Sequence, residues 1–173
     1  KVIEIKPEWA VGFIMLGQIH LTQGNADQAI ENLKKAIEIE PKNHELYSTI
    51  GEEYLQKGDV DEAIKYLEQA LKQNPNSSSA LSIVGDAYNQ KGDHDLAINY
   101  LTRAISLDPD NAKAHFSIAS ALDDKGDYES AIKSYKNAIR IKPDYAVAYC
   151  NLGNLQRAKG HFNAAIKSFK KSL

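Results

Sequence analysis

The segment Lys125–Asp144 reads KGDYESAIKSYKNAIRIKPD, and two close copies of it precede it in the chain. Lys91–Asp110 reads KGDHDLAINYLTRAISLDPD and Lys57–Asn76 reads KGDVDEAIKYLEQALKQNPN, each 34 residues before the next. Proline occurs at positions 7, 41, 75, 109 and 143, and one glycine series occurs at 24, 58, 92, 126 and 160, again every 34 residues. A fixed period of this length predicts an array of stacked structural repeats.

Each repeat has the pattern of two helices joined by a short turn. In the copy at 42–75, the first helical stripe contains Leu46, Tyr47, Ile50, Tyr54 and Leu55 and the second contains Ala63, Ile64, Leu67, Ala70 and Leu71. Between them, Gly58 can adopt the left-handed conformation that ends a helix, and Asp59 suits the N-cap of the next helix. Pro75 prevents the second helix from continuing.

Small residues recur in the middle of these helices. Glycine inside a helix costs about 1 kcal/mol relative to alanine, and this cost is tolerated where a neighbouring helix crosses too close for a Cβ atom. The first helices carry Gly51, Gly85, Ala119 and Gly153 at this place, and the second helices carry Ala29, Ala63, Ala97, Ala131 and Ala165. We therefore expect a close helix crossing within every repeat.

The pattern resembles the tetratricopeptide repeat, in which a large residue precedes Leu-Gly, Tyr, Ala, an aromatic residue and Pro. The chain carries it as Phe13-Leu16-Gly17-His20-Ala29-Leu33-Pro41, Tyr47-Ile50-Gly51-Tyr54-Ala63-Leu67-Pro75, Leu81-Val84-Gly85-Tyr88-Ala97-Leu101-Pro109, His115-Ile118-Ala119-Leu122-Ala131-Tyr135-Pro143 and Tyr149-Leu152-Gly153-Gln156-Ala165-Phe169. The fourth copy departs from the pattern by replacing glycine with Ala119. The resemblance covers essentially the whole chain and implies an all-α, right-handed superhelical solenoid of antiparallel helix pairs.

The period also sets the expected domain organisation. We expect residues 1–7 to be the tail of a truncated upstream repeat, followed by repeat 1 (8–41), repeat 2 (42–75), repeat 3 (76–109), repeat 4 (110–143) and a truncated repeat 5 (144–173), together forming one solenoid domain. Residues 1–7, KVIEIKP, are similar to residues 35–41, KAIEIEP. This similarity predicts that the 173 residues are part of a longer array or a multidomain protein.

Composition limits the classes of partner. The formal charge of −2 offers no basic field for nucleic acid or an anionic membrane, and no apolar run is long enough to span a bilayer. No charged-then-apolar leader is visible at the start. The single cysteine, Cys150, excludes an internal disulfide framework and favours a reducing compartment such as the cytoplasm.

No combination of residues suggests catalysis, a metal or a cofactor. None of the five histidines, His20, His44, His94, His115 and His161, lies three or four residues from another, so no metal-binding helix face is predicted. Neither a Ser-His-Asp order nor a glycine-rich phosphate loop occurs, since the repeat accounts for the glycines. We therefore expect no enzymatic activity and no catalytic or metal-binding residues.

In this family the first helix of each pair lines the concave face, so its variable residues are the expected peptide-binding positions. The predicted groove residues are Met15, Gln18, Glu45, Ser48, Glu52, Ser82, Asp86, Asn89, Lys113, Phe116, Ser120, Asp123, Asn151, Asn154 and Arg157. With Asp124, the variable positions of this face carry five acids and two bases, a net charge of −3. The acidic balance favours a basic peptide, although solvated charges on an ordinary surface would give the same pattern.

Two binding patterns known in the family are largely missing. Of the five positions that would form a clamp for a chaperone's C-terminal carboxylate, only Lys113 carries a matching residue in the best register. Of the asparagine ladder found in arrays attached to sugar transferases, only Asn151 is present. The chain is therefore expected to bind neither kind of ligand in those established ways.

Apolar residues near both ends predict a second type of contact. The expected end-to-end residues are Val2, Ile3, Ile5, Phe162, Ile166, Phe169 and Leu173. Exposed apolar patches favour association, and a head-to-tail contact need not close into a ring. The main functional prediction is a protein-protein interaction scaffold that binds an extended peptide or partner segment. The alternatives are the substrate-recruiting arm of a larger enzyme and a module that self-associates head to tail.

Overall fold

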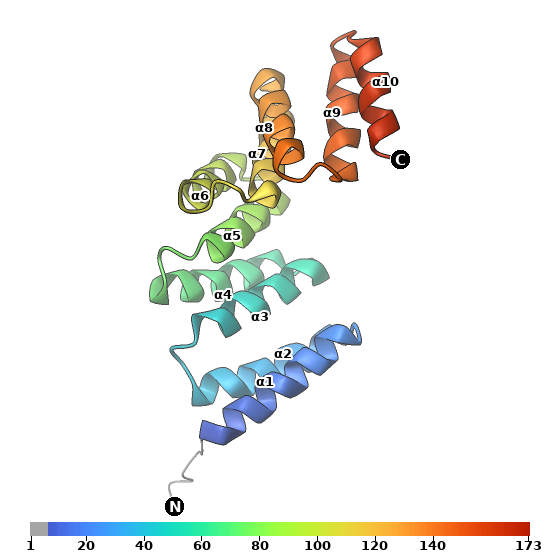
Figure 1. Ribbon diagram of the computed structural model, residues 1–173. Helices are drawn as coiled ribbons and strands as arrows, with labels where there is room; N and C mark the ends of the chain where they lie inside the picture. Colours follow the sequence, from blue (N-terminus) through green and yellow to red (C-terminus); the bar gives the residue numbers. More distant parts are fainter. Residues whose placement is uncertain (1–6) are drawn as a thin grey trace, which may run out of the picture. The chain divides into compact units, whose positions relative to one another are not determined.

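The computed structural model describes residues 7–173, with side chains from Trp9 onward, and these residues form ten α-helices and no strand (Figure 1). In chain order the helices are α1 (Pro7–Thr22), α2 (Ala26–Ile39), α3 (His44–Lys57), α4 (Val60–Gln73), α5 (Ser78–Lys91), α6 (His94–Leu107), α7 (Ala112–Asp124), α8 (Tyr128–Ile141), α9 (Ala146–Ala158) and α10 (Phe162–Lys171). The fold is the all-α solenoid class predicted from the period.

The chain divides into two compact parts, and the boundary lies inside α5. The N-terminal part ends at Ala87, and the C-terminal part begins at Tyr88. Within the N-terminal part, α1 packs on α2, α2 on α3 and α3 on α4. Within the C-terminal part, α6 packs on α7, α7 on α8, α8 on α9 and α9 on α10. Each part therefore repeats the same helix-on-helix arrangement.

The turn glycines have the conformation that their position requires. Gly58 ends α3 with φ of +84°, and its backbone N–H donates to the carbonyl oxygens of Leu55 and Tyr54. The equivalent glycines 24, 92, 126 and 160 also have positive φ, between +74° and +85°. A residue with a Cβ atom is strained there, so the spacing of these glycines sets where each first helix stops.

The N-cap prediction holds only partly. Asp93 accepts a hydrogen bond from the Leu96 N–H at 3.3 Å, and Asp127 accepts one from the Ser130 N–H at 3.2 Å, as N-cap residues do. Asp59 occupies the same position before α4, but its side chain makes no capping hydrogen bond. Its carboxylate instead lies 3.9 Å from Lys57 Nζ.

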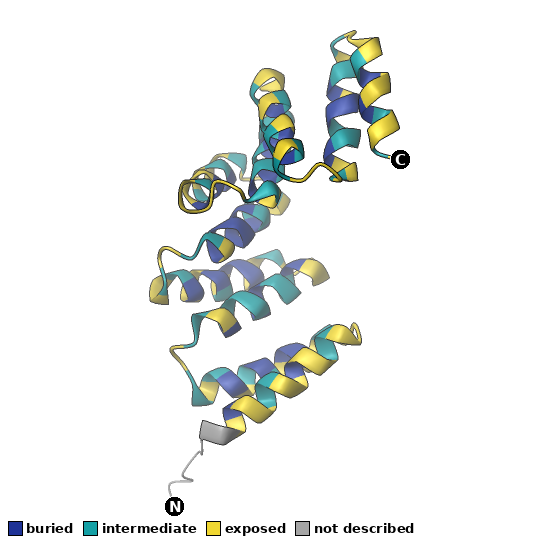
Figure 2. Cartoon of the chain, in the orientation of Figure 1, coloured by how far each residue is buried: buried dark blue, intermediate teal, exposed yellow. Residues whose placement is uncertain are grey.

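The close helix crossings are confirmed. A Cβ atom added to Gly51 of α3 would lie 2.5 Å from Leu67 Cγ and 3.1 Å from the Ala63 carbonyl oxygen of α4. The alanine series of the second helices is 0 to 3% exposed at positions 29, 63, 97, 131 and 165. Figure 2 shows the buried residues on the faces where the helices of a pair meet.

Two apolar clusters hold neighbouring repeats together. In the N-terminal part, Ile30 and Leu33 of α2 are buried in one cluster with Leu46 and Ile50 of α3. In the C-terminal part, the cluster comprises Ala119, Ala131, Tyr135, Ala148, Leu152 and Leu155 from α7, α8 and α9. The junction between successive repeats is therefore apolar and is built from the same register positions each time.

A series of ion pairs accompanies these junctions along one edge. The lysine of one turn pairs with an acid in the first turn of the preceding repeat's second helix: Lys57 with Asp27, Lys125 with Asp95, and Lys159 with Glu129. We call these three pairs the lysine ladder. The hydrogen bond to Asp27 raises the pKa of Lys57, and the hydrogen bond from Lys159 lowers the pKa of Glu129. Both changes favour the charged forms that make the pairs.

Candidate peptide-binding groove

One cavity of about 260 Å³ brings together several of the predicted groove residues in the N-terminal part. Residues 45, 48, 49 and 52 follow one another at helical spacing, so they lie on one face of α3. The facing side comes from the start of α5 and the residue before it. The lining residues are His44, Glu45, Ser48, Thr49, Glu52, Ser77, Ser79 and Ile83.

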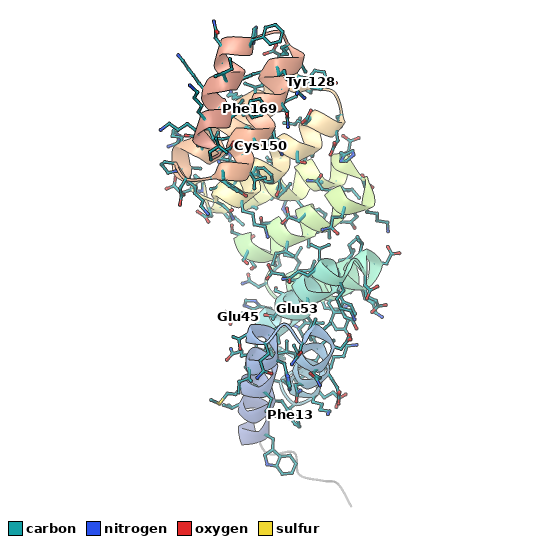
Figure 3. The ribbon with its side chains drawn as sticks, turned by 90° about the vertical axis from the view of Figure 1, so that its right-hand side faces the viewer. Phe13, Glu45, Glu53, Tyr128, Cys150 and Phe169 are labelled. Carbon is teal, nitrogen blue, oxygen red and sulfur yellow. The ribbon has the colours of Figure 1, made fainter. Side chains whose placement is uncertain are left out.

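The cavity contains two carboxylates and no lysine or arginine among its lining residues. Glu45 is exposed and Glu52 is half-buried, and Figure 3 shows Glu45 and the neighbouring Glu53 on α3. Burial, and to a lesser extent the charge of Glu52, raises the pKa of Glu53. The negative potential on this helix is therefore strong enough to disfavour a further carboxylate.

The hydroxyl groups of the cavity are oriented by their own helix. Ser48 Oγ donates to the His44 carbonyl oxygen at 3.1 Å, and Thr49 Oγ1 donates to the Glu45 carbonyl oxygen at 3.0 Å. Because these hydroxyls have used their single hydrogen, their lone pairs can accept hydrogen bonds from a ligand. His44 Nε2 lies 3.3 Å from Asn74 Nδ2, which holds the ring against the end of α4.

Three other predicted residues of the N-terminal part lie outside this cavity. Met15 and Gln18 of α1 are exposed. Ser82 of α5 is only 3% exposed, and its hydroxyl has no hydrogen-bond partner. Asp86, further along α5, is half-buried. The N-terminal part thus gathers Glu45, Ser48 and Glu52 but not the rest of the prediction.

In the C-terminal part, the predicted residues of α7 have mixed roles. Lys113 is exposed, whereas Phe116, Ser120 and Asp123 are half-buried. The ring of Phe116 packs against Tyr135 and Tyr145, with centroid distances of 5.6 Å and 5.1 Å. Phe116 therefore belongs largely to the hydrophobic core.

The carboxyl group of Asp123 has a shifted pKa. Partial burial raises the pKa of Asp123, and the neighbouring charge of Asp124 raises it further. The charged form of Asp123 is consequently less favourable than that of an ordinary aspartate.

Two of the predicted asparagines are engaged within the protein. Asn89 Nδ2 donates to the Ser117 carbonyl oxygen at 2.9 Å, and Asn151 Nδ2 donates to Tyr135 Oη at 3.2 Å. Tyr135 is fully buried, and burial raises the pKa of its hydroxyl to about 12. The other two α9 residues, Asn154 and Arg157, are exposed, and Cys150 is half-buried and unpaired (Figure 3).

The residues expected at the ends are of three kinds. Phe162, Ile166 and Leu173 are exposed. Phe169 is half-buried and lies over Gly153 of its own repeat, where an added Cβ atom would come within 2.8 Å of the ring. Val2, Ile3 and Ile5 fall outside the described residues.

Sequence reasoning missed three residues of the cavity: His44, Ser77 and Ile83. Ile83 follows Ser79 by four residues, so helical spacing could have placed it on the same face. His44 and Ser77 lie beside helix starts, where side-chain direction depends on the loop conformation. The sequence offers no comparable signal for those two.

Two further searches bear on other kinds of site. Among the described residues, no group of three or more histidine, cysteine, aspartate or glutamate side chains could hold a metal ion. No helix in residues 7–173 combines the length and the apolar character needed to cross a membrane.

Comparison with family models points consistently to one repeat. Models of the tetratricopeptide repeat match residues 10–74, 48–112 and 100–133, and a model described as a TPR repeat matches residues 119–160. A search of curated proteins finds no significant match.

Solved structures show the same fold over most of the chain. The chain is 31% identical to a MamA protein whose crystal structure is known, with 97% of this chain and 92% of that chain covered and a TM-score of 0.81. MamA 41-end from Desulfovibrio magneticus RS-1 is 22% identical, covering 95% and 93%, with a TM-score of 0.84. Pseudomonas aeruginosa pilF is 17% identical, covering 95% and 75%, with a TM-score of 0.86. The last two likenesses concern the fold alone.

Proposed function

Because the chain belongs to the tetratricopeptide repeat family, we propose that it is a protein-interaction scaffold that binds an extended, basic segment of a partner protein. The binding site in this proposal is the cavity between α3 and α5 and the surface that continues from it. The observation that carries the proposal is the presence of Glu45 and Glu52 in one cavity with no lysine or arginine in its lining.

The cavity suits a lysine or arginine side chain of the partner. Its charged end would meet Glu45 and Glu52, while its aliphatic stem would lie along Ile83. The lone pairs of the Ser48 and Thr49 hydroxyls would accept hydrogen bonds from backbone N–H groups of the extended segment. A concave wall with charge of one sign also increases the local concentration of an oppositely charged ligand.

The expected affinity is modest. Exposed ion pairs contribute roughly 0–1 kcal/mol each and weaken with added salt. Two such pairs and a few hydrogen bonds correspond to weak, reversible binding. This strength suits a scaffold that exchanges its partners.

The proposal is tested with two extended peptides of equal length, one rich in lysine and one rich in aspartate. We expect the basic peptide to bind more tightly at low salt and to lose affinity as salt is added, measured by fluorescence anisotropy. Glu45→Gln and Glu52→Gln should each weaken this binding. Glu68→Gln is the matched control, because Glu68 is an exposed glutamate of α4 outside the cavity.

Tighter binding of the acidic peptide would refute the proposal, as would equal binding of both peptides without a salt effect. An equal loss of binding in Glu68→Gln would also refute it, since the effect would then come from overall charge.

The proposed role includes no chemical step by this chain. In the alternative in which the chain recruits substrates for a larger enzyme, the same cavity would hold the substrate's basic segment. We place this binding in a reducing compartment such as the cytoplasm, which is compatible with the unpaired Cys150.

A further inference from the structure

Helix α1 has apolar residues on every side but packs on α2 along only one of them. A helix that is apolar all round is normally covered all round. Exposed residues recur along α1 in Figure 2, and Leu16 and Ile19 on this side are 46% and 50% exposed. The uncovered side of α1 is therefore unusual within this chain.

The other repeats show what this side of a first helix normally does. At the register of Leu16, Ile50 and Val84 are fully buried, Leu152 is 4% exposed and Ile118 is half-buried. The register of Ile19 contains Ala87, Ala121 and Leu155, all buried, and the half-buried Glu53. In the repeats that follow, these positions pack against the second helix of the repeat before.

Helix α10 presents the complementary half of such a junction. Ile166 is 52% exposed, whereas Ile30 and Ile64 at the same register are buried and Ile98 and Ile132 are half-buried. Leu173, at the register of Ile37 and Ile139, is fully exposed. Phe162 differs, because its register-mate Tyr128 is also exposed although another repeat follows it.

The internal junctions show how the two halves fit. Between α2 and α3, Ile30 and Ile37 pack with Leu46 and Ile50. Between α8 and α9, Ile132 and Ile139 pack with Leu152 and Leu155. The corresponding residues at the two uncovered faces are Ile166 and Leu173 on α10 and Leu16 and Ile19 on α1. Each face therefore matches the other more closely than it matches itself.

We propose that α10 of one copy packs against α1 of a second copy, so that Ile166 and Leu173 contact the second copy's Leu16 and Ile19 in a head-to-tail junction. The contact repeats a junction that the chain already forms internally. It does not depend on the groove or its ligand. Because the two surfaces differ, the contact is heterologous and can continue into open stacks.

The lysine ladder supports the same pairing. The register of Lys57, Lys125 and Lys159 contains Gln23 in the first repeat, and the register of Asp27, Asp95 and Glu129 contains Asn163 in the last. A head-to-tail junction would therefore bring two neutral amides together where the internal junctions have an ion pair. Neither partner would bring an uncompensated charge to the contact.

The first test measures mass against concentration by sedimentation velocity. We expect the average mass of the chain to rise above 19.2 kDa as concentration increases to about millimolar, the range of weak association. Leu16→Asp and Ile166→Asp should each remain at the monomer mass. Leu96→Asp is the matched control, because Leu96 is 41% exposed on α6, away from both faces.

The second test mixes the two variants. Leu16→Asp keeps an intact α10 face and Ile166→Asp keeps an intact α1 face, so an equimolar mixture should form one junction and stop at twice 19.2 kDa. Recovery of this dimer would also show that both variants fold. A junction between two α10 faces or two α1 faces would not give this result.

The third test adds the missing ion pair. A chain carrying both Gln23→Lys and Asn163→Asp should associate at a concentration lower by up to about fivefold, and the gain should disappear in high salt. Neither substitution alone should have this effect.

Several outcomes would overturn the proposal. These are a mass that stays at 19.2 kDa at all concentrations, a mixture of the two variants that fails to dimerise, or an equal loss of association in Leu96→Asp. In the first case the two faces would serve other segments or partners.

Discussion

Gly51 shows how a single residue controls the distance between two helices. The space beside it is occupied by Leu67, whose Cγ would lie 2.5 Å from an added Cβ atom. We predict that Gly51→Ala lowers the free energy of unfolding by about 1–3 kcal/mol through overpacking. This loss should exceed the gain of about 1 kcal/mol in helix propensity. Urea denaturation monitored by circular dichroism measures the difference.

Gly12 provides the matched control for this prediction. It also lies within a helix, but no atom comes within 4 Å of an added Cβ. Gly12→Ala should therefore raise the free energy of unfolding by up to about 1 kcal/mol. If both substitutions changed stability in the same direction, the steric explanation for Gly51 would be wrong.

Asp123 makes stability depend on pH. Burial and the charge of Asp124 raise its pKa in the folded state above that of an unfolded chain. Its contribution to stability is therefore greatest below the unfolded-state pKa and is lost as the pH rises through the folded-state pKa. We predict that Asp123→Asn raises the urea midpoint at neutral pH and that this gain vanishes in acid.

The control for Asp123 is Asp110→Asn, which neutralises an exposed loop aspartate. It should change the midpoint little at either pH. A gain from Asp123→Asn that persisted unchanged in acid would contradict the assignment.

At the scale of helices, the lysine ladder connects successive repeats at their turns. Its acidic members are highly exposed, between 81 and 85%, so each pair should contribute little and should be sensitive to salt. We predict that Lys125→Gln slightly lowers the urea midpoint at low salt and leaves it unchanged at high salt. A loss of equal size at both salt concentrations would point to packing of the lysine stem instead.

The helices were predictable because proline and glycine mark their ends at every repeat. The ladder was not predicted, although lysine at 57, 91, 125 and 159 and acids at 27, 61, 95 and 129 recur together. The two partners of a pair are 30 residues apart. Their contact depends on the offset between neighbouring repeats, which a sequence period does not specify.

The groove was predicted only in part for a related reason. Ser82 and Ser48 share a register, but α5 buries Ala80, Leu81, Ile83 and Val84 along with Ser82, whereas Ser48 is half-buried and lines the cavity. Asn151 was expected to face a ligand but donates to Tyr135. Such differences arise from local packing of individual side chains, which the repeated pattern leaves open.

At the scale of the molecule, each repeat is stabilised by its neighbours, so stability should fall toward α1 and α10. Among the described residues, α1 packs mainly on α2 and α10 mainly on α9, whereas α3 and α8 each pack on two helices. We predict that amide hydrogens of α1 and α10 exchange faster than those of α3 and α8 at low protein concentration. Mass spectrometry of exchanged peptides measures this.

Concentration provides an internal control for the exchange experiment. If copies associate through α1 and α10, raising the concentration should slow exchange in those two helices and leave α3 and α8 unchanged. Equal exchange rates in all four helices at low concentration would contradict the nearest-neighbour account of stability.

The left-handed glycine turns have a consequence for how such a chain can change length over generations. Gly58 and Gly92 have φ values of +84° and +85° and are each followed by aspartate. A genetic crossover that removed residues 59–92 would join Gly58 to Asp93 and restore the same turn. The shortened chain would still alternate first and second helices, with every junction built from the usual register positions. Deletions and duplications of 34 residues therefore preserve the fold, whereas changes of other lengths break it.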